Sequence, residues 1–214
     1  MKIIEPGFEI MSNINRDELL KHIEACGRVC YKSEKNITEE SAGKFVKGLI
    51  KRGHEAMIEH YSITVKFICD RGVSHEIVRH RLASFAQEST RYCNYIKDDF
   101  GSEITVIKPF FFKEGTDAWY FWKKSCEEAE KAYFNLLTWG CSPQEARSIL
   151  PNSLKTEVVV TMNLREWRHF FKLRALGTTG APHPQMKEVA LPLLKEFSAF
   201  LPEVFGDLEV TENA

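Results

Sequence analysis

Apolar and polar residues follow regular patterns along this chain, and two segments carry the clearest ones. Residues 63–68 largely alternate between apolar and polar, which is typical of a half-buried strand. Residues 158–162 form a short apolar run rich in β-branched side chains, which predicts a buried strand. Helical patterns follow both segments, at residues 73–85 and 163–174. The sequence therefore predicts two places where a strand leads directly into a helix. Weaker strand patterns cover residues 2–11 and 104–107.

Start and stop signals predict further helices in the first third of the chain. Asn15, with Glu18 three residues later, predicts the N-cap of a helix that reaches about Cys30. Thr38 is expected to cap a second helix, whose apolar residues recur with helical spacing. Gly53 stands where a left-handed residue ends such a helix.

The second half of the chain carries equally specific signals. A long helix is expected from Asp117 to about Trp139, followed by a glycine. Residues 142–145, Ser-Pro-Gln-Glu, combine a capping box with proline at the first helical position, so a short helix should start there and carry Arg147. A last helix should follow residues 183–184, with a kink near Pro192 and a frayed acidic tail after Gly206.

Composition limits the class of protein. The chain has 214 residues, 43% of them hydrophobic and 28% charged, which is enough for one sizeable core, and a single domain over residues 1–214 is expected. A net charge of -1 argues against a sequence-independent nucleic-acid binder, which needs a large basic excess. The sequence has no apolar run long enough for a membrane span and no secretory signal pattern, so a cytoplasmic location is expected.

The arginines are unevenly distributed. Eight of the eleven fall within residues 71–91 and 147–174, while lysine predominates elsewhere. Because guanidinium groups bind phosphate and carboxylate through two parallel hydrogen bonds, these two windows indicate anion recognition. Two salt-bridged helical faces would produce the same distribution, and the sequence leaves that alternative open.

The densest part of the first window is the triplet Arg79-His80-Arg81, followed by Ser89 and Arg91. If the triplet is helical, its members differ in direction by about 100° each and cannot all face one partner. They must serve at least two surfaces. That arrangement suits a site where two ligands meet, or where neighbouring subunits complete one another's pockets.

Cysteines and the remaining histidines indicate no metal or disulfide framework. The six cysteines are scattered without a Cys-x-x-Cys pair, so reduced thiols are expected. His54, Glu55, Glu59 and His60 lack the HExxH spacing that places two ligands on one helical face, so no metal site is expected there.

These residues also resemble a known family. The stretch RHRLASFAQESTRY resembles the signature of the flavin-dependent thymidylate synthases, Arg-His-Arg with seven intervening residues before serine. Further similar blocks follow the family's order between about residues 26 and 190. They are Gly53-His54-Glu55 with Glu59-His60, Arg147 before a Leu-Pro pair, and Asn163-Leu164-Arg165 leading to Arg174.

The resemblance implies an activity, a fold and an assembly. The activity is methylation of dUMP to dTMP for dTTP synthesis, with 5,10-methylenetetrahydrofolate as carbon donor, FAD as hydride carrier and NADPH as reductant. The fold is a mixed α/β (α+β) domain with a mainly antiparallel central sheet flanked by helices. The assembly is a homotetramer with sites shared between subunits, which would explain a triplet that serves two surfaces.

The resemblance also assigns residues by position. FAD contacts are implied for Arg79, His80, Arg81, Gln87, Asn163, Arg165 and His169. Nucleotide contacts are implied for Glu76, Arg79, Gln87, Glu88, Ser89, Thr90, Arg91, Arg147 and Arg174. Arg174 is similar to the arginine set against the pyrimidine ring, where its charge would favour electron density at the reacting carbon, so the catalytic role is expected there. Ser89 is expected to bind substrate, since no neighbouring base would activate its hydroxyl.

Some positions depart from the family's pattern. Ala56 stands where a hydroxyl residue often contacts flavin, and His169 occupies a position that takes asparagine or histidine. His183 and Gln185 carry no assignment to flavin or folate.

Two other classes remain as alternatives, a nucleotide-binding regulatory module and a phosphoryl-transfer enzyme with arginine clamps. The second would usually bring a glycine-rich phosphate loop, and neither GxxxxGK[ST] nor GxGxxG is present.

Overall fold

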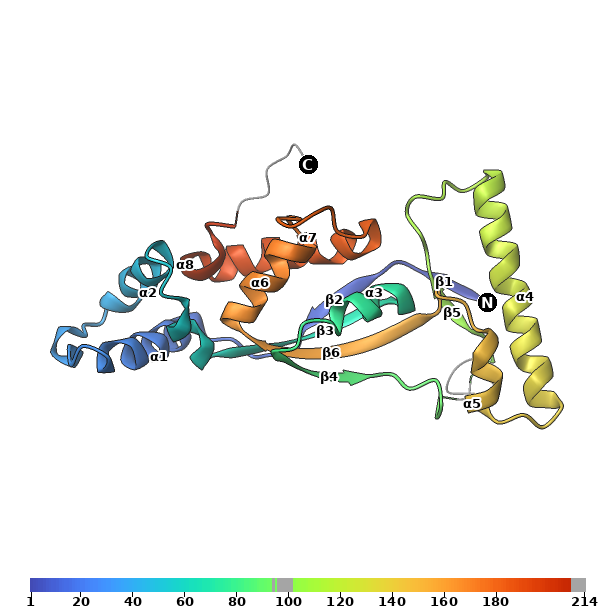
Figure 1. The fold of residues 1–214 in the computed structure, drawn as a ribbon, viewed down its shortest axis with the longest axis horizontal. Helices are drawn as coiled ribbons and strands as arrows, with labels where there is room; N and C mark the ends of the chain where they lie inside the picture. The colour runs from blue at the N-terminus through green and yellow to red at the C-terminus, as the bar shows by residue number, and fades with distance from the viewer. Residues whose placement is uncertain (94, 96–101, 209–214) are drawn as a thin grey trace. The chain divides into compact units, whose positions relative to one another are not determined.

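The computed structural model describes residues 1–93, 95 and 102–208. It has the mixed α/β architecture expected from the sequence, with helices flanking an antiparallel sheet (Figure 1). The larger sheet has four strands in the order β2-β3-β6-β4, and a smaller one pairs β1 with β5. The larger sheet's strands are β2 (Gly7–Ile10), β3 (Ser62–Asp70), β4 (Ala83–Gln87) and β6 (Lys155–Asn163).

Contacts divide the chain into two compact units. Unit 1 contains residues 1–7, 67–79 and 86–159, and unit 2 contains residues 8–66, 80–85 and 160–214. Strands β3 and β6 each belong partly to both units, so the chain passes between the units several times. The single domain expected over the whole chain stays a prediction.

Unit 1 is built around the smaller sheet and a long helix. Strands β1 (Lys2–Ile4) and β5 (Thr105–Ile107) pair in parallel, and Tyr133 from the long helix is fully buried in the adjoining core. The helices of unit 1 are α3 (Arg71–Ile77), α4 (Asp117–Thr138), α5 (Pro143–Ala146) and the 3-10 turn η4 (Arg147–Ile149).

Unit 2 holds most of the remaining helices and an aromatic core. Trp167, Phe170, Phe171 and Phe197 are fully buried, and the Trp167 indole N–H donates to the Ile63 carbonyl of β3, 3.0 Å away. Burying such large rings supplies much of the apolar stabilisation of this unit. Its helices are α1 (Arg16–Val29), η1 (Glu34–Asn36), α2 (Ser41–Lys51), η2 (Glu55–His60), α6 (Leu164–Arg174), α7 (Pro184–Phe200) and α8 (Pro202–Phe205).

Most of the predicted helix ends are confirmed. The Asn15 side chain accepts from the first backbone amides of α1, and the capping box of Ser142 with Glu145 opens α5. Gly53 has a left-handed φ of 70° just past α2. The cap predicted at Thr38 is wrong, because α2 starts three residues later and the Thr38 amide instead donates to the Ser41 hydroxyl. Residues 209–214, within the tail expected to fray, lie outside the described residues.

The helix predicted over residues 73–85 is wrong in its second half. Helix α3 ends at Ile77, and residues 83–87 instead form β4 beside β6. Pairing of β4 with β6 therefore overrides the local helical pattern. Residues 83–87 can join the sheet only because the helix ends before them. The Arg79-His80-Arg81 triplet lies in the connection between α3 and β4, so these three residues are not part of a helix.

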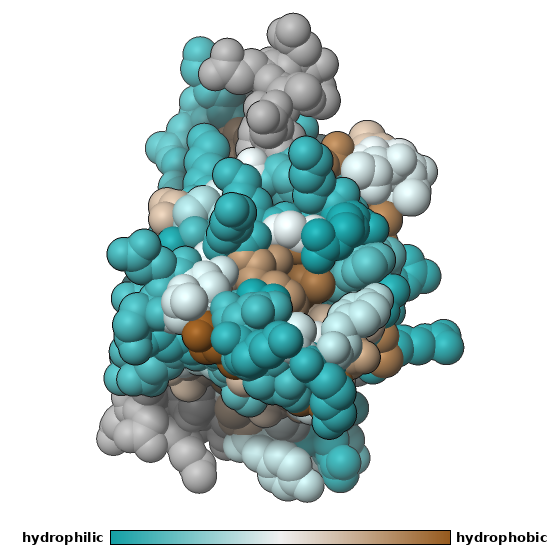
Figure 2. Space-filling model, turned by 90° about the vertical axis from the view of Figure 1, so that its left-hand side faces the viewer, coloured by the Kyte–Doolittle hydropathy of each residue, from teal (hydrophilic) through white to brown (hydrophobic). Residues whose placement is uncertain are grey.

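None of the helices in the described part of the chain is long and apolar enough to cross a membrane. Figure 2 shows the face on which α1 and α2 lie in Figure 1, with polar residues surrounding a small apolar area. Helices α1 and α2 and the turn η2 also line an apolar pocket of about 550 Å³ that includes Tyr31, Phe45 and Met57.

Candidate functional site

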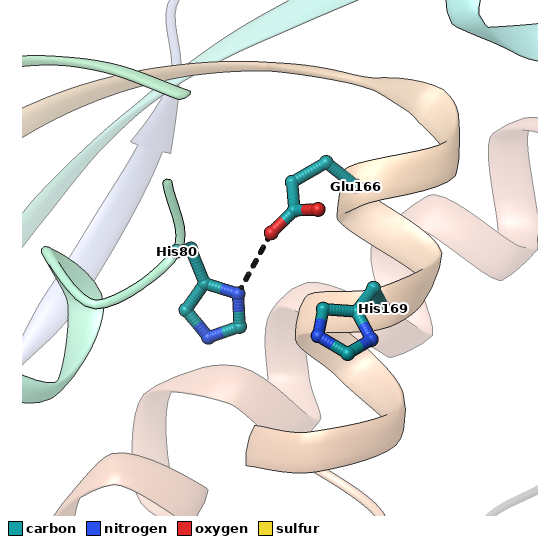
Figure 3. A group of neighbouring side chains, drawn as sticks. All are labelled: His80, Glu166 and His169. Atoms are coloured by element: carbon teal, nitrogen blue, oxygen red, sulfur yellow. Dashed lines mark hydrogen bonds and ion pairs between the residues drawn. The ribbon is translucent and has the colours of Figure 1, made fainter. Parts of the chain in front are cut away.

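Four side chains of unit 2 form what we call the histidine cluster: His80, Glu166, His169 and Arg174. His80 Nδ1 lies 3.0 Å from a carboxylate oxygen of Glu166 (Figure 3). Arg174 Nε donates to His80 Nε2 over 3.2 Å. The rings of His80 and His169 meet edge to face at 5.7 Å. The cluster thus joins the connection after α3 to three successive turns of α6.

Local structure explains how α6 presents this cluster. Asn163 caps the helix by accepting from the Glu166 amide at 2.8 Å, which fixes the first turn. Glu166 and His169 are three residues apart and therefore neighbours on one helical face. Phe170 packs its ring edge to face against His80 at 5.1 Å, so one side of the imidazole is apolar.

Burial controls the charge of the cluster. His80 is 4% exposed and Glu166 7% exposed. Burial is the largest cause that lowers the pKa of His80 below its usual value, the Glu166 carboxylate opposes the shift, and Arg174 and His169 add to it. The imidazole is therefore held neutral at physiological pH, although it is bonded to a carboxylate.

The donor atoms of His80, Glu166 and His169 lie within 4.8 Å of one another, close enough to hold a metal ion. Two of these atoms are already bonded to each other, which satisfies the buried carboxylate without a cation. Among the described residues, His54, Glu55, Glu59 and His60 do not gather into such a group. The absence of a metal site at those four residues stays a prediction.

A cavity of about 410 Å³ adjoins the histidine cluster within unit 2. It combines cationic groups for an anion, from Arg165 and Lys172, with the amide of Asn163 and the apolar side chain of Leu82. This donor set fits a cofactor with phosphates and a flat ring. Arg165 is already paired with the Glu59 carboxylate, so a bound phosphate would compete with that ion pair. The cavity lining is Glu55, Glu59, Leu82, Asn163, Arg165, Glu166, His169 and Lys172.

A second polar group lies in unit 1, where β4 runs into the loop of residues 87–91. The Gln87 amide donates to the Ser74 hydroxyl at 3.0 Å and to the Thr156 hydroxyl at 3.2 Å. Arg71 bonds the Glu88 carbonyl at 3.4 Å and the same Thr156 hydroxyl at 3.3 Å. Strand β6 and helix α3 therefore fix the start of the 87–91 loop.

Charged residues fix the rest of this loop. The Glu88 carboxylate accepts from Lys155 at 3.0 Å and from the Tyr95 hydroxyl at 3.3 Å. Arg147 donates to the buried Thr90 hydroxyl at 3.3 Å, while its side chain stays largely exposed. The loop thus has a braced base and a cationic rim that an anionic ligand could reach.

The side chains of Arg79, His80 and Arg81 differ in burial, not in the helical face on which they lie. Arg79 and Arg81 are exposed, His80 between them is buried, and the boundary between the two units falls between Arg79 and His80. Arg91 is exposed, with its guanidinium over the Tyr92 ring at 5.4 Å. The three side chains therefore differ in environment, and their service of two surfaces stays a prediction.

Each unit brings part of the expected set together. In unit 2, His80, His169 and Arg174 are gathered with Asn163 and Arg165 nearby along α6. In unit 1, Thr156 and Arg71 connect Gln87 with Glu88, Arg147 bonds Thr90, and Glu76 and Ser89 are half-buried. The roles that the resemblance implies for these residues stay predictions.

Salt-bridged arginines, the alternative left open by the sequence, account for part of the second window. Arg168 is 2% exposed and bonds Glu55, Asp207 and the Val204 carbonyl, so it serves the fold. Glu166 is the main site residue that the sequence did not single out. Its place in the first turn of α6 suggests only a favourable helix-start charge, and its partner is remote in sequence.

Of the positions that depart from the family's pattern, His169 belongs to the histidine cluster and Ala56 does not. Ala56 lines the apolar pocket of about 550 Å³ instead of the cavity beside α6. His183 is exposed just before α7, while Gln185 is buried in its first turn.

Comparisons with known proteins agree with the motifs. The family model described as thymidylate synthase complementing protein matches residues 14–203. A flavin-dependent thymidylate synthase of Pyrococcus furiosus is 35% identical over 167 residues, which cover 78% of this chain and 66% of that protein. One from Corynebacterium glutamicum is 30% identical over 206 residues, covering 88% and 79%. The chain thus spans about two thirds of the length of the archaeal relative.

A solved structure shares the fold. The crystal structure of a UMP/dUMP methylase from Streptomyces cacaoi, bound with 5-Br dUMP, superposes with a TM-score of 0.77 at 22% identity and covers 96% of each chain. At that identity the likeness supports the arrangement of helices and strands.

Proposed function

Because this chain belongs to the thymidylate synthase complementing protein family, we propose that it is a flavin-dependent thymidylate synthase, which methylates dUMP to dTMP for dTTP synthesis. The carbon donor is 5,10-methylenetetrahydrofolate, the reductant is NADPH and the cofactor is FAD. The enzyme works in the cytoplasm as a homotetramer. The observation that carries the proposal is that the family match over residues 14–203 includes both polar groups.

The histidine cluster and its cavity would hold the flavin. Asn163, Arg165 and His169 line the cavity, and Arg165 supplies the positive charge that a pyrophosphate requires. His80, Arg79, Arg81 and Gln87 complete the proposed FAD contacts. When bound, reduced flavin supplies the hydride, and the protein's task is to bind, orient and polarise.

The 87–91 loop and its arginines would hold the nucleotide. Arg91 and Arg147 suit the phosphate because they are exposed guanidinium groups beside a braced loop. Glu76, Arg79, Glu88, Ser89 and Thr90 would bind the rest of dUMP. Arg174 would act as the catalytic residue, since its fixed positive charge can stabilise negative charge that develops on the pyrimidine.

The test is a turnover assay with dUMP that carries tritium at C5. Transfer of a carbon to C5 replaces that hydrogen, so tritium should reach water only when the folate donor and NADPH are both supplied, and dTMP should appear in equal amount. The purified protein should be yellow from bound flavin. A colourless protein that binds dUMP without turnover would indicate a regulatory module, and phosphate transfer from a nucleoside triphosphate would indicate the phosphoryl-transfer class.

A further inference from the structure

Glu166 has no assigned role, yet it is among the most buried charged groups of the described chain. Its side chain is 8% exposed and lies on the first turn of α6, where one carboxylate oxygen contacts His80 Nδ1 at 3.0 Å. A buried carboxylate is costly unless it is hydrogen-bonded, so this contact must satisfy it (Figure 3).

The hydrogen bonds of His80 determine where its proton lies. Arginine offers N–H donors and no acceptor, so the bond from Arg174 Nε requires an unprotonated Nε2 on His80. An ionised carboxylate only accepts, so the bond to Glu166 requires a proton on Nδ1. Both bonds can exist together only in the neutral imidazole with its proton on Nδ1.

We propose that Glu166 is a positioning residue that holds the His80 proton on Nδ1, so that Nε2 accepts from Arg174 and fixes the guanidinium in one orientation. The catalytic part of this inference rests on the proposed function of Arg174. Without Glu166 the proton would also occupy Nε2, where it would point at an arginine donor and repel it. The arginine would then sample other rotamers, and its charge would no longer be aimed at one place.

The surroundings of the pair favour this role. Burial lowers the pKa of His80, which keeps the imidazole neutral and leaves Nε2 able to accept. Phe170 and His169 pack against the ring, so its orientation is limited before any ligand binds. A purely structural role for Glu166, as a favourable charge at the start of α6, would predict no effect on the His80 proton.

The first test reads the proton directly and needs no turnover. Magic-angle-spinning 15N spectra of the purified protein labelled at histidine distinguish protonated from bare ring nitrogens, and a His80→Asn variant identifies the His80 signals. In the wild-type protein, Nδ1 should be protonated and Nε2 bare. Glu166→Ala should give a mixture of the two tautomers. A wild-type proton on Nε2, or an unchanged tautomer in Glu166→Ala, would overturn the proposal.

The second test separates positioning from folding. Glu166→Gln keeps a carbonyl acceptor for Nδ1–H while it removes the charge, so it should retain the tautomer and most of the wild-type kcat. Glu166→Ala should lower kcat by roughly tenfold or more, with little change in the KM for dUMP. Equal loss of kcat in both variants with the Nδ1 tautomer retained would show that charge matters and overturn the proposal. If the alanine variant fails to fold, the glutamine variant and the wild-type spectrum still decide.

Glu24 provides a matched control in the same unit. It is 1% exposed and accepts from Arg28 at 2.8 Å and Ser41 at 2.7 Å. Glu24→Ala should lower the thermal midpoint but leave the His80 tautomer and kcat unchanged. A preparation with the expected tautomer but no dTMP formation would overturn the proposed function and support the assignment of Glu166. An active enzyme with the proton on Nε2 would do the reverse.

Discussion

The histidine cluster of unit 2 and the 87–91 loop of unit 1 differ in how deeply their charged groups are buried and in how those groups are held. In the cluster, His80 and Glu166 are buried and satisfy each other, and Arg174 is tied to His80, so charge is fixed before a ligand arrives. In the loop, the backbone is braced while Arg91 and Arg147 remain exposed. A charged group that polarises a reacting atom acts best when it is held rigidly and away from water. Arginines that bind a phosphate can stay hydrated until the ligand arrives.

Removing Arg174 is expected to have the largest effect on activity. Arg174→Ala should lower kcat for dTMP formation by about 10²–10³-fold, because a fixed charge aimed at the reacting ring is lost. Bound flavin, measured by absorption, should largely remain. Arg16→Ala, which removes an exposed arginine of α1, serves as control and should keep full activity. An active Arg174→Ala enzyme would contradict the contrast between the two regions.

Arg168 tests whether the second arginine window also includes residues that serve only the fold. Arg168→Met should lower the free energy of unfolding by about 2–3 kcal/mol, because Glu55 and Asp207 lose a buried partner. Denaturant unfolding measures this change. Lys21→Ala, which removes one member of an exposed pair with Glu39, should leave stability unchanged. A stable Arg168→Met protein that fails to bind flavin would instead place Arg168 in the site.

Substitution of Arg147 tests the proposal that the 87–91 loop and its arginines bind the phosphate of dUMP. Arg147→Ala should raise the KM for dUMP by about tenfold with kcat nearly unchanged, because it removes a charged hydrogen bond made equally in ground and transition states. Thr90→Val removes the hydroxyl that Arg147 contacts and should give a smaller change in the same direction. A fall in kcat without a rise in KM would show that Arg147 belongs with the histidine cluster in function.

The resemblance assigns Arg79 to both the flavin and the nucleotide, so its removal should affect both ligands. Arg79→Ala is expected to weaken dUMP binding and flavin retention together, each by a few-fold, since its exposed guanidinium follows α3 directly. Flavin content and dUMP titration measure the two effects separately. Loss of only one ligand would restrict Arg79 to a single site.

Acid should weaken the cluster by a small amount. Because the pKa of folded His80 is lowered, the unfolded chain binds a proton near its usual value of 6.5 while the buried ring does not. The free energy of unfolding should therefore fall as pH drops below that value and level off once the folded ring also titrates. Denaturant unfolding at several pH values would show this slope, and a His80→Gln variant should reduce it.

Much of the fold was predictable because its signals are local. Strands β3 and β6 follow their apolar patterns, and Asn15 and Ser142 cap helices at the predicted positions. The helix predicted over residues 73–85 is too long because its last residues, 83–85, pair with the neighbouring strand as part of β4. A pairing partner that is remote in sequence leaves no trace in a local window.

The candidate site shows the same division between local and remote information. By itself, the sequence determined which chemical groups the protein has and their order along the chain. That order was enough to indicate the family. Only the tertiary structure decided that His80 is buried between two exposed arginines and that it joins Glu166 to Arg174. The reason is physical. The burial and hydrogen bonds of His80 depend on Glu166 and Arg174, which are 86 and 94 residues away along the chain. These remote partners set the charge and the proton position of His80, which its sequence neighbours cannot specify.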